Sequence, residues 1–138
     1  MQMLKFCVVC LAALLTLMPA TGQAAGIALK NSMNADIKSV FCVGNNGERL
    51  SVIEGLPKRA TKTVAAAKFP EHSCTRIGVT MQNGAGWQYY HEPEPGSAKE
   101  IEFGMDAAGR NETRKYPSML ITMPDGDAYV APAGVPMF

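Results

Sequence analysis

The chain has 138 residues, and its 13 Lys and Arg side chains against 12 Asp and Glu give a formal net charge of +1. A chain of this length makes one ordinary domain with a single core. Nucleic-acid binding proteins normally carry a strong basic excess, which this composition lacks. Length and charge therefore argue against several domains and against a nucleic-acid partner.

The first residues have the organisation of a secretory signal peptide. Lys5 supplies a positive charge, and residues 6–18 contain only Thr16 as a polar residue before Pro19. A membrane-spanning helix needs about twenty apolar residues, more than this run provides. We therefore expect a cleaved signal helix and no permanent membrane anchor.

The small side chains that signal peptidase requires are supplied by Gly22 and Ala24, which predicts cleavage before Ala25. Ala20 and Gly22 offer a second frame two residues earlier. The predicted organisation is a signal peptide at residues 1–24, one domain at residues 25–130 and a flexible C-terminal tail at residues 131–138. The protein is expected to be periplasmic or secreted, and removal of Lys5 leaves 12 basic and 12 acidic residues.

Cleavage would also remove two of the four cysteines. Cys7 and Cys10 have the C-x-x-C spacing of redox and zinc sites, but both lie in the signal segment. Cys42 and Cys74 remain, and disulfides persist in exported proteins. We expect these two to be bonded to each other, because a free reactive thiol beside a partner thiol is disfavoured in an oxidising space.

The rest of the chain alternates short apolar runs with turn signals. Arg76 to Met81 shows the clearest period of two, and Asn83-Gly84 is a strong hairpin signal that leads into an aromatic run. No window has a convincing helical period, and residues 106–115 read as a loop. Strands are expected at residues 27–30, 37–43, 49–53, 61–67, 76–81, 86–91, 99–103, 118–123 and 128–130.

Eight or nine short antiparallel strands at about ten-residue spacing, with one disulfide, are typical of an all-β protein. We expect a single small β-sandwich. A small closed barrel is the alternative.

Part of the chain resembles small secreted bacterial β-sandwich (immunoglobulin-like) domains of no assigned function. The resemblance covers about residues 27–103, and Lys58-Arg59 departs from it where such domains often carry glycine. It implies a sandwich fold and a bacterial envelope setting, and it implies no catalytic residues. The matching elements are Ile27-x-Leu29-x-Asn31, Asp36-Ile37, Leu56-Pro57, Thr61-x-Thr63-Val64, Cys74-x-x-Ile77-x-Val79 and Gly86-Trp87.

Three groups of polar residues are candidates for catalysis or metal binding. His72 and Ser73 are neighbours, and neighbours on an extended chain point in opposite directions, so they do not form a nucleophile and base pair. His91 and the glutamates that follow it lie in a proline-rich segment that keeps carboxylates apart. Glu100 and Glu102 share a face of one strand, as on any half-exposed strand. We expect no catalytic residue, metal or cofactor.

Trp87, Tyr89 and Tyr90 form the candidate ligand surface. Trp87 and Tyr89 share one face of a strand and Tyr90 takes the other, so at least one ring should point outward. Such rings either stack on sugars or fill a small core with their polar groups bonded at its rim.

The expected function is that of a non-enzymatic exported binding or structural domain of the bacterial envelope. Its partner would be another envelope protein or a glycan, and the oligomeric state is left open. One alternative is a small carbohydrate-binding module that uses the exposed aromatics. Another is a pilin-like or adhesive subunit, because free sheet edges can pair with a strand of a neighbour.

Overall fold

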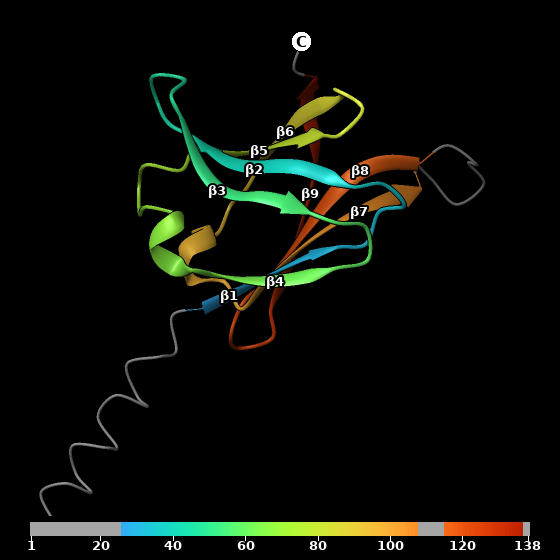
Figure 1. Cartoon of the computed structure of the whole chain (residues 1–138). Helices are drawn as coiled ribbons and strands as arrows, with labels where there is room; N and C mark the ends of the chain where they lie inside the picture. The colour runs from blue at the N-terminus through green and yellow to red at the C-terminus, as the bar shows by residue number, and fades with distance from the viewer. Residues whose placement is uncertain (1–25, 108–114, 137–138) are drawn as a thin grey trace, which may run out of the picture.

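The computed structural model describes residues 26–107 and 115–136. Nine strands form one sheet in the order β3-β2-β5-β6-β9-β8-β7-β1-β4, nearly closed into a barrel (Figure 1). The elements are β1 (Gly26–Asn31), β2 (Ile37–Val43), β3 (Arg49–Leu56), β4 (Thr61–Ala65), η1 (Ala66–Lys68), β5 (Arg76–Met81), β6 (Gly86–Tyr90), η2 (Pro95–Ser97), β7 (Glu100–Ala107), β8 (Lys115–Thr122) and β9 (Ala128–Pro136). The all-β prediction is therefore confirmed.

The predicted separation into two sheets is not confirmed, because β9 belongs to both halves of the structure. Residues 128–132 pair with β8, and residues 133–136 pair with β6, with a shift in register between Gln88 and Tyr89 of β6. Figure 1 shows β9 passing from the group that contains β7 and β8 to the group that contains β5 and β6. One long strand thereby joins what the sequence suggested would be two layers.

All neighbouring strands are antiparallel except β1 and β7, which run parallel. The two ends of the sheet, β3 and β4, meet without a strand ladder between them. The ammonium group of Lys62 on β4 donates a hydrogen bond of 3.1 Å to the carbonyl of Gly55 on β3. This seam is where the barrel stays open.

The core lies inside the curved sheet, because the strands alternate buried and exposed residues as the period-two pattern requires. In β7, Ile101 and Phe103 are fully buried while Glu100 and Glu102 are half-buried. The largest fully buried side chains are Tyr89, Phe69, Phe103, Ile27, Leu29, Ile37, Leu56, Ile77, Ile101, Met119, Ile121 and Val40.

Several strand boundaries differ from the predictions. The predicted strand at residues 61–67 ends at Ala65, and a short 3-10 helix, η1, follows where the alanines stand. Residues 131–136, which the sequence placed in a C-terminal tail, are part of β9. Most of the predicted loop at residues 106–115 lies outside the described residues, and its two ends extend β7 and β8.

The predicted disulfide is confirmed. Cys42 on β2 is bonded to Cys74, which precedes β5, and their Cα atoms are 5.0 Å apart. Both cysteines are buried, and β2 and β5 are neighbouring strands. The bond therefore fixes the loop that leads into β5 against the strand beside it.

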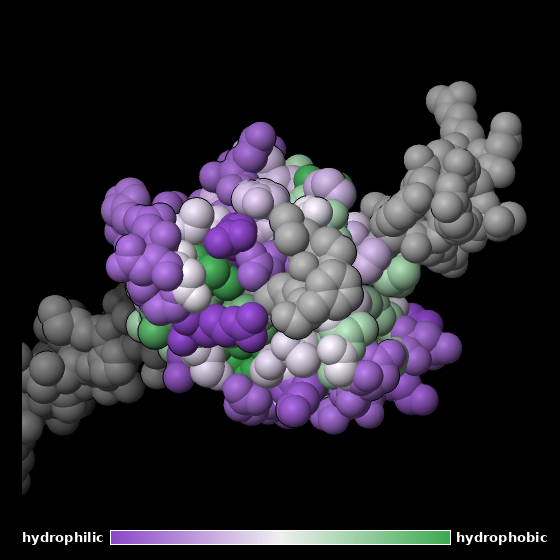
Figure 2. Space-filling view, turned by 90° about the horizontal axis from the view of Figure 1, so that it is seen from above, coloured by the Kyte–Doolittle hydropathy of each residue, from purple (hydrophilic) through white to green (hydrophobic). Residues whose placement is uncertain are grey.

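Among the described residues no helix is long and apolar enough to cross a membrane. Hydrophilic residues make up most of the outline of the barrel end seen in Figure 2, and hydrophobic residues show between them. The predicted signal helix at residues 1–24 lies outside the described part of the chain.

Candidate functional site

The three predicted aromatic residues have different positions. Tyr89 is completely buried, Trp87 is half-buried, and Tyr90 is 54% exposed. Tyr89 packs in the core, with its ring centroid 6.0 Å from that of Phe103. Tyr90 is therefore the residue of this group that presents its ring to solvent.

Trp87 and Tyr89 form a polar pair at the edge of the core. The indole Nε1 of Trp87 donates a hydrogen bond to the hydroxyl of Tyr89. Burial raises the pKa of the Tyr89 phenol well above its usual range, and the hydrogen bond from Trp87 acts in the opposite direction. Trp87 and Tyr89 thus bond to each other on the inner face of β6. Tyr90 is the aromatic residue on the outer face of this strand.

The ring of Tyr90 is held in place by two neighbours. The guanidinium carbon of Arg76, the cross-strand partner of Tyr90, lies 5.8 Å from the ring centroid. Gly134 on β9 lies against the same ring, because a Cβ added there would be 2.6 Å from Cε2 of Tyr90. Glycine at this position lets the ring lie close to the β9 backbone.

A groove of about 430 Å³ lies beside Tyr90, between the end of β6 and the first half of β9. It contains a second exposed aromatic, Tyr129, which is 39% exposed. The residues that line it are Tyr90, His91, Glu92, Pro93, Ile121, Ala128, Tyr129, Val130, Ala131 and Pro132. We call this site the β6–β9 groove.

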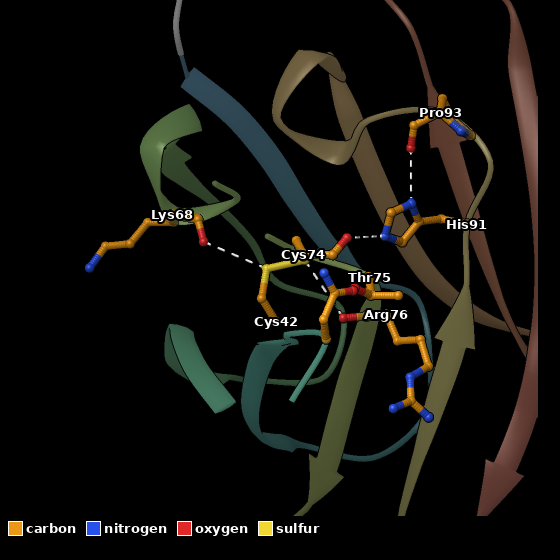
Figure 3. Close-up of a disulfide and its surroundings, with 8 residues drawn as sticks. Cys42, Lys68, Cys74, Thr75, Arg76, His91 and Pro93 are labelled. Atoms are coloured by element: carbon orange, nitrogen blue, oxygen red, sulfur yellow. Dashed lines mark hydrogen bonds between the residues drawn. A yellow bond between two sulfur atoms is a disulfide. The ribbon is translucent and has the colours of Figure 1, made fainter. Parts of the chain in front are cut away.

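One wall of the groove is fixed by His91. Its Nε2 lies 2.8 Å from the carbonyl oxygen of Cys74, and its Nδ1 lies 3.0 Å from that of Pro93 (Figure 3). Since both ring nitrogens face backbone oxygens, the imidazole holds the segment after β6 against the disulfide loop. These contacts leave the ring poorly placed to act as a base or metal ligand.

The other polar groups that the sequence singled out do not converge. His72 is highly exposed and lies 3.4 Å from Glu71 and 3.7 Å from Glu94. Exposed pairs of this kind contribute little to stability. Glu102 accepts a hydrogen bond from the hydroxyl of Ser32. Within residues 26–107 and 115–136, no group of three or more His, Cys, Asp and Glu side chains is arranged to hold a metal ion.

Sequence reasoning missed Tyr129, Val130 and the groove itself. Tyr129 is a single aromatic residue in a short predicted strand, and its sequence neighbours give no functional signal. Its position near Tyr90 depends on the pairing of β6 with β9, which joins segments about forty residues apart. No local pattern carries that information.

Comparison of the chain with protein-family models, with curated proteins and with solved structures finds no match.

Proposed function

We propose that this chain is an exported, non-enzymatic binding domain of the bacterial envelope, and that the β6–β9 groove is its ligand surface. In this proposal residues 1–24 are a signal peptide and the mature domain is periplasmic or secreted. The apolar run at residues 6–18 supports export. The Cys42–Cys74 bond is compatible with an oxidising compartment.

The observation that carries the binding proposal is the position of Tyr90. A large ring that is 54% exposed, and is also held by Arg76 and Gly134, costs less entropy to immobilise on binding than a freely rotating side chain. Tyr129 adds a second ring to the same groove. Aromatic side chains of this kind contribute most of the binding energy at many protein interfaces.

A glycan is the second candidate ligand, because the groove is lined by two exposed tyrosine rings and tyrosine rings can stack on sugar rings. A protein ligand is favoured by the lining of the groove. Both ring nitrogens of His91 face backbone oxygens and so are not directed at a sugar hydroxyl in the groove. Pro93, Val130 and Pro132 give the groove apolar walls, which suit the apolar side chains of a protein. The relation to small secreted sandwich domains also belongs to this proposal, and the grouping of strands on either side of β9 supports it.

Export is tested by expressing the full chain in a Gram-negative host and separating the periplasm from the cytoplasm. We expect periplasmic protein whose N-terminus, read by sequencing, begins at Ala25 or two residues earlier. Alkylation of the unreduced, denatured protein should modify no thiol. Protein that stays in the cytoplasm with residues 1–24 intact would refute export.

Binding is tested by photo-crosslinking the domain in an envelope fraction, followed by titration with the purified partner. Tyr90→Ala should reduce the affinity for that partner by at least about tenfold, as expected for a central aromatic residue. Leu50→Ala is the matched control, because Leu50 is an exposed apolar side chain on the distant strand β3. Equal affinity of the two variants would show that the groove is not the ligand surface.

A further inference from the structure

One stretch of β9 has a strand on only one side. Residues 128–132 pair with β8, whereas the pairing with β6 begins at Ala133. Over residues 128–132 no described strand lies along the edge that faces away from β8. The β6–β9 groove therefore lies along an unpaired strand edge.

The register of β9 against β8 shows which backbone groups of β9 face the β6–β9 groove. The amide of Met123 donates a hydrogen bond of 2.8 Å to the carbonyl of Asp127, which makes these two a hydrogen-bonded pair. Hydrogen-bonded and non-hydrogen-bonded pairs alternate along an antiparallel ladder. Ala128 and Val130 are therefore in non-hydrogen-bonded pairs with β8, and their N–H and C=O groups point toward the groove.

Pro132 has the same orientation as Ala128 and Val130, since it lies two residues farther along β9. A proline lacks the N–H group and is tolerated in a sheet where that group would not meet a neighbouring strand. Its presence agrees with an edge that β8 does not use. It also limits the free donors of this stretch to those of Ala128 and Val130.

The side chains around the edge come from both faces of the sheet. Ile121 and Ala131 are buried, whereas Val130 is 62% exposed, and all three line the groove. The groove therefore extends from the outer face of β9, past the edge of this strand, to side chains of the inner face. An added strand would place alternate side chains inward, toward Ile121 and Ala131, and outward, beside Tyr90 and Val130.

The charged residues in and beside the groove indicate which charge an added strand should carry. Glu92 lines it, and Asp127 immediately precedes the free stretch of β9. Arg76 of β5 lies against the ring of Tyr90. No Lys or Arg is among the described residues that line the groove. A partner with basic residues is thus complementary to this site.

We infer that the groove binds an extended segment of a partner protein, which adds as a strand beside residues 128–132 of β9 and carries alternating apolar and basic residues. Main-chain hydrogen bonds to an exposed sheet edge and side-chain pockets beside it are the features of this recognition mode. The inference rests on the proposed binding function and specifies the ligand. A glycan would leave the backbone groups of Val130 without a matching strand.

A synthetic seven-residue peptide of alternating valine and lysine, acetylated and amidated, is the probe. Titrated into the mature oxidised domain, it should shift the NMR signals of the Ala128 and Val130 amides and slow hydrogen exchange at Val130. The same peptide with every amide N-methylated keeps its side chains and charges but cannot donate main-chain hydrogen bonds. Its binding should be at least about tenfold weaker. A valine and glutamate peptide should also bind more weakly, because of Glu92 and Asp127.

Val130→Pro removes one donor from the edge and should weaken binding of the valine and lysine peptide about five- to tenfold. Ser51→Pro is the control on β3. The amide of Gly44 donates to the carbonyl of Glu48, so Ser51 also has its N–H group directed away from the neighbouring strand. If Val130→Pro fails to fold, the N-methylated peptide still decides the question with the unaltered protein.

Strand addition is overturned if the probe leaves the Val130 amide unaffected at millimolar concentration, or if the N-methylated peptide binds equally well. It is also overturned if concentrated domain alone protects the Val130 amide, since a second copy would then fill the groove. A glycan pool that perturbs the groove while the peptide does not would overturn it as well. If Tyr90→Ala loses binding to the envelope partner but the peptide leaves the Val130 amide unaffected, the proposed binding function stands and only strand addition is rejected.

Discussion

The side-chain amide of Asn31 donates a hydrogen bond of 3.0 Å to the backbone carbonyl of Leu56, twenty-five residues farther along the chain. The same amide group donates to the carbonyl of Ala35 at 2.9 Å, and its oxygen accepts from the amide of Met33 at 2.9 Å. Asn31 is fully buried. One side chain therefore joins the turn after β1 to the end of β3.

Asn31→Ala is expected to lower the free energy of unfolding by about 2 to 3 kcal/mol. The substitution leaves the Leu56 carbonyl and the Met33 amide buried without a partner, and such groups cost more than the bond itself contributes. Urea unfolding followed by tryptophan fluorescence measures the change. Asn34→Ala, an exposed position in the same turn, should change stability by less than about 0.5 kcal/mol. Equal effects of the two variants would contradict the role given to Asn31.

The strands that could be predicted from sequence are those whose local pattern agrees with their final environment. Strand β5 and strand β2 have the predicted bounds, because alternation and flanking turns identify both. The second half of β9 was missed because Pro132 and Gly134 read as chain breakers. In the structure these residues lie where β9 changes partner, and proline and glycine are acceptable at such an edge.

The candidate site was only partly predictable, because several of its contacts join residues far apart in the sequence. An outward ring on β6 is predictable, because neighbouring residues of a strand point to opposite faces, and Tyr90 is that ring. Which ring faces inward depends on the curvature of the sheet and on Phe103, a residue of another strand. Tyr129 reaches the same groove only through the pairing of β9 with its neighbours. These contacts are non-local and have no signature in a short window of sequence.

Gly134→Ala tests whether the position of the Tyr90 ring matters for binding. The added Cβ would lie 2.6 Å from the ring and would push it away from β9 without removing it. We expect the valine and lysine peptide to bind at least about threefold more weakly, with the fold retained because Tyr90 is exposed. Gly104→Ala is the control, since the nearest atom outside its chain neighbours, Cβ of Ser32, would be 3.9 Å away. Unchanged peptide affinity in Gly134→Ala would show that the ring position is unimportant.

Breaking the disulfide should cost about 3 to 4 kcal/mol. The bond closes a loop with a sequence separation of 32 residues, and the chain-entropy model gives about 3.7 kcal/mol for a loop of this length. Guanidinium unfolding of the oxidised protein, compared with the Cys42→Ala/Cys74→Ala double variant, measures the difference. His91 contacts the carbonyl of Cys74, so its ring NMR signals should also move in the variant. A loss below about 1 kcal/mol would contradict the role of the disulfide as the main constraint on this loop.

Tyr89 predicts a specific loss of stability in alkaline solution. Burial raises the pKa of its phenol above the value of about 10 that it has in the unfolded chain. Stability from a raised pKa is fully present below the unfolded value and is lost as the pH rises through the folded one. Above about pH 10 the unfolded chain releases this proton while the folded protein keeps it, so unfolding is favoured by up to about 1.4 kcal/mol for each further pH unit.

Tyr89→Phe isolates this effect. At pH 8 the variant should be about 1 kcal/mol less stable than the parent, because the indole of Trp87 loses its acceptor. Between pH 8 and pH 11 the gap should close, since only the parent carries the buried phenol. Urea unfolding at both pH values measures it, and Tyr90→Phe, at an exposed position, should show no such convergence. A gap that stays constant over this range would mean that the Tyr89 hydroxyl does not keep its proton in the folded protein.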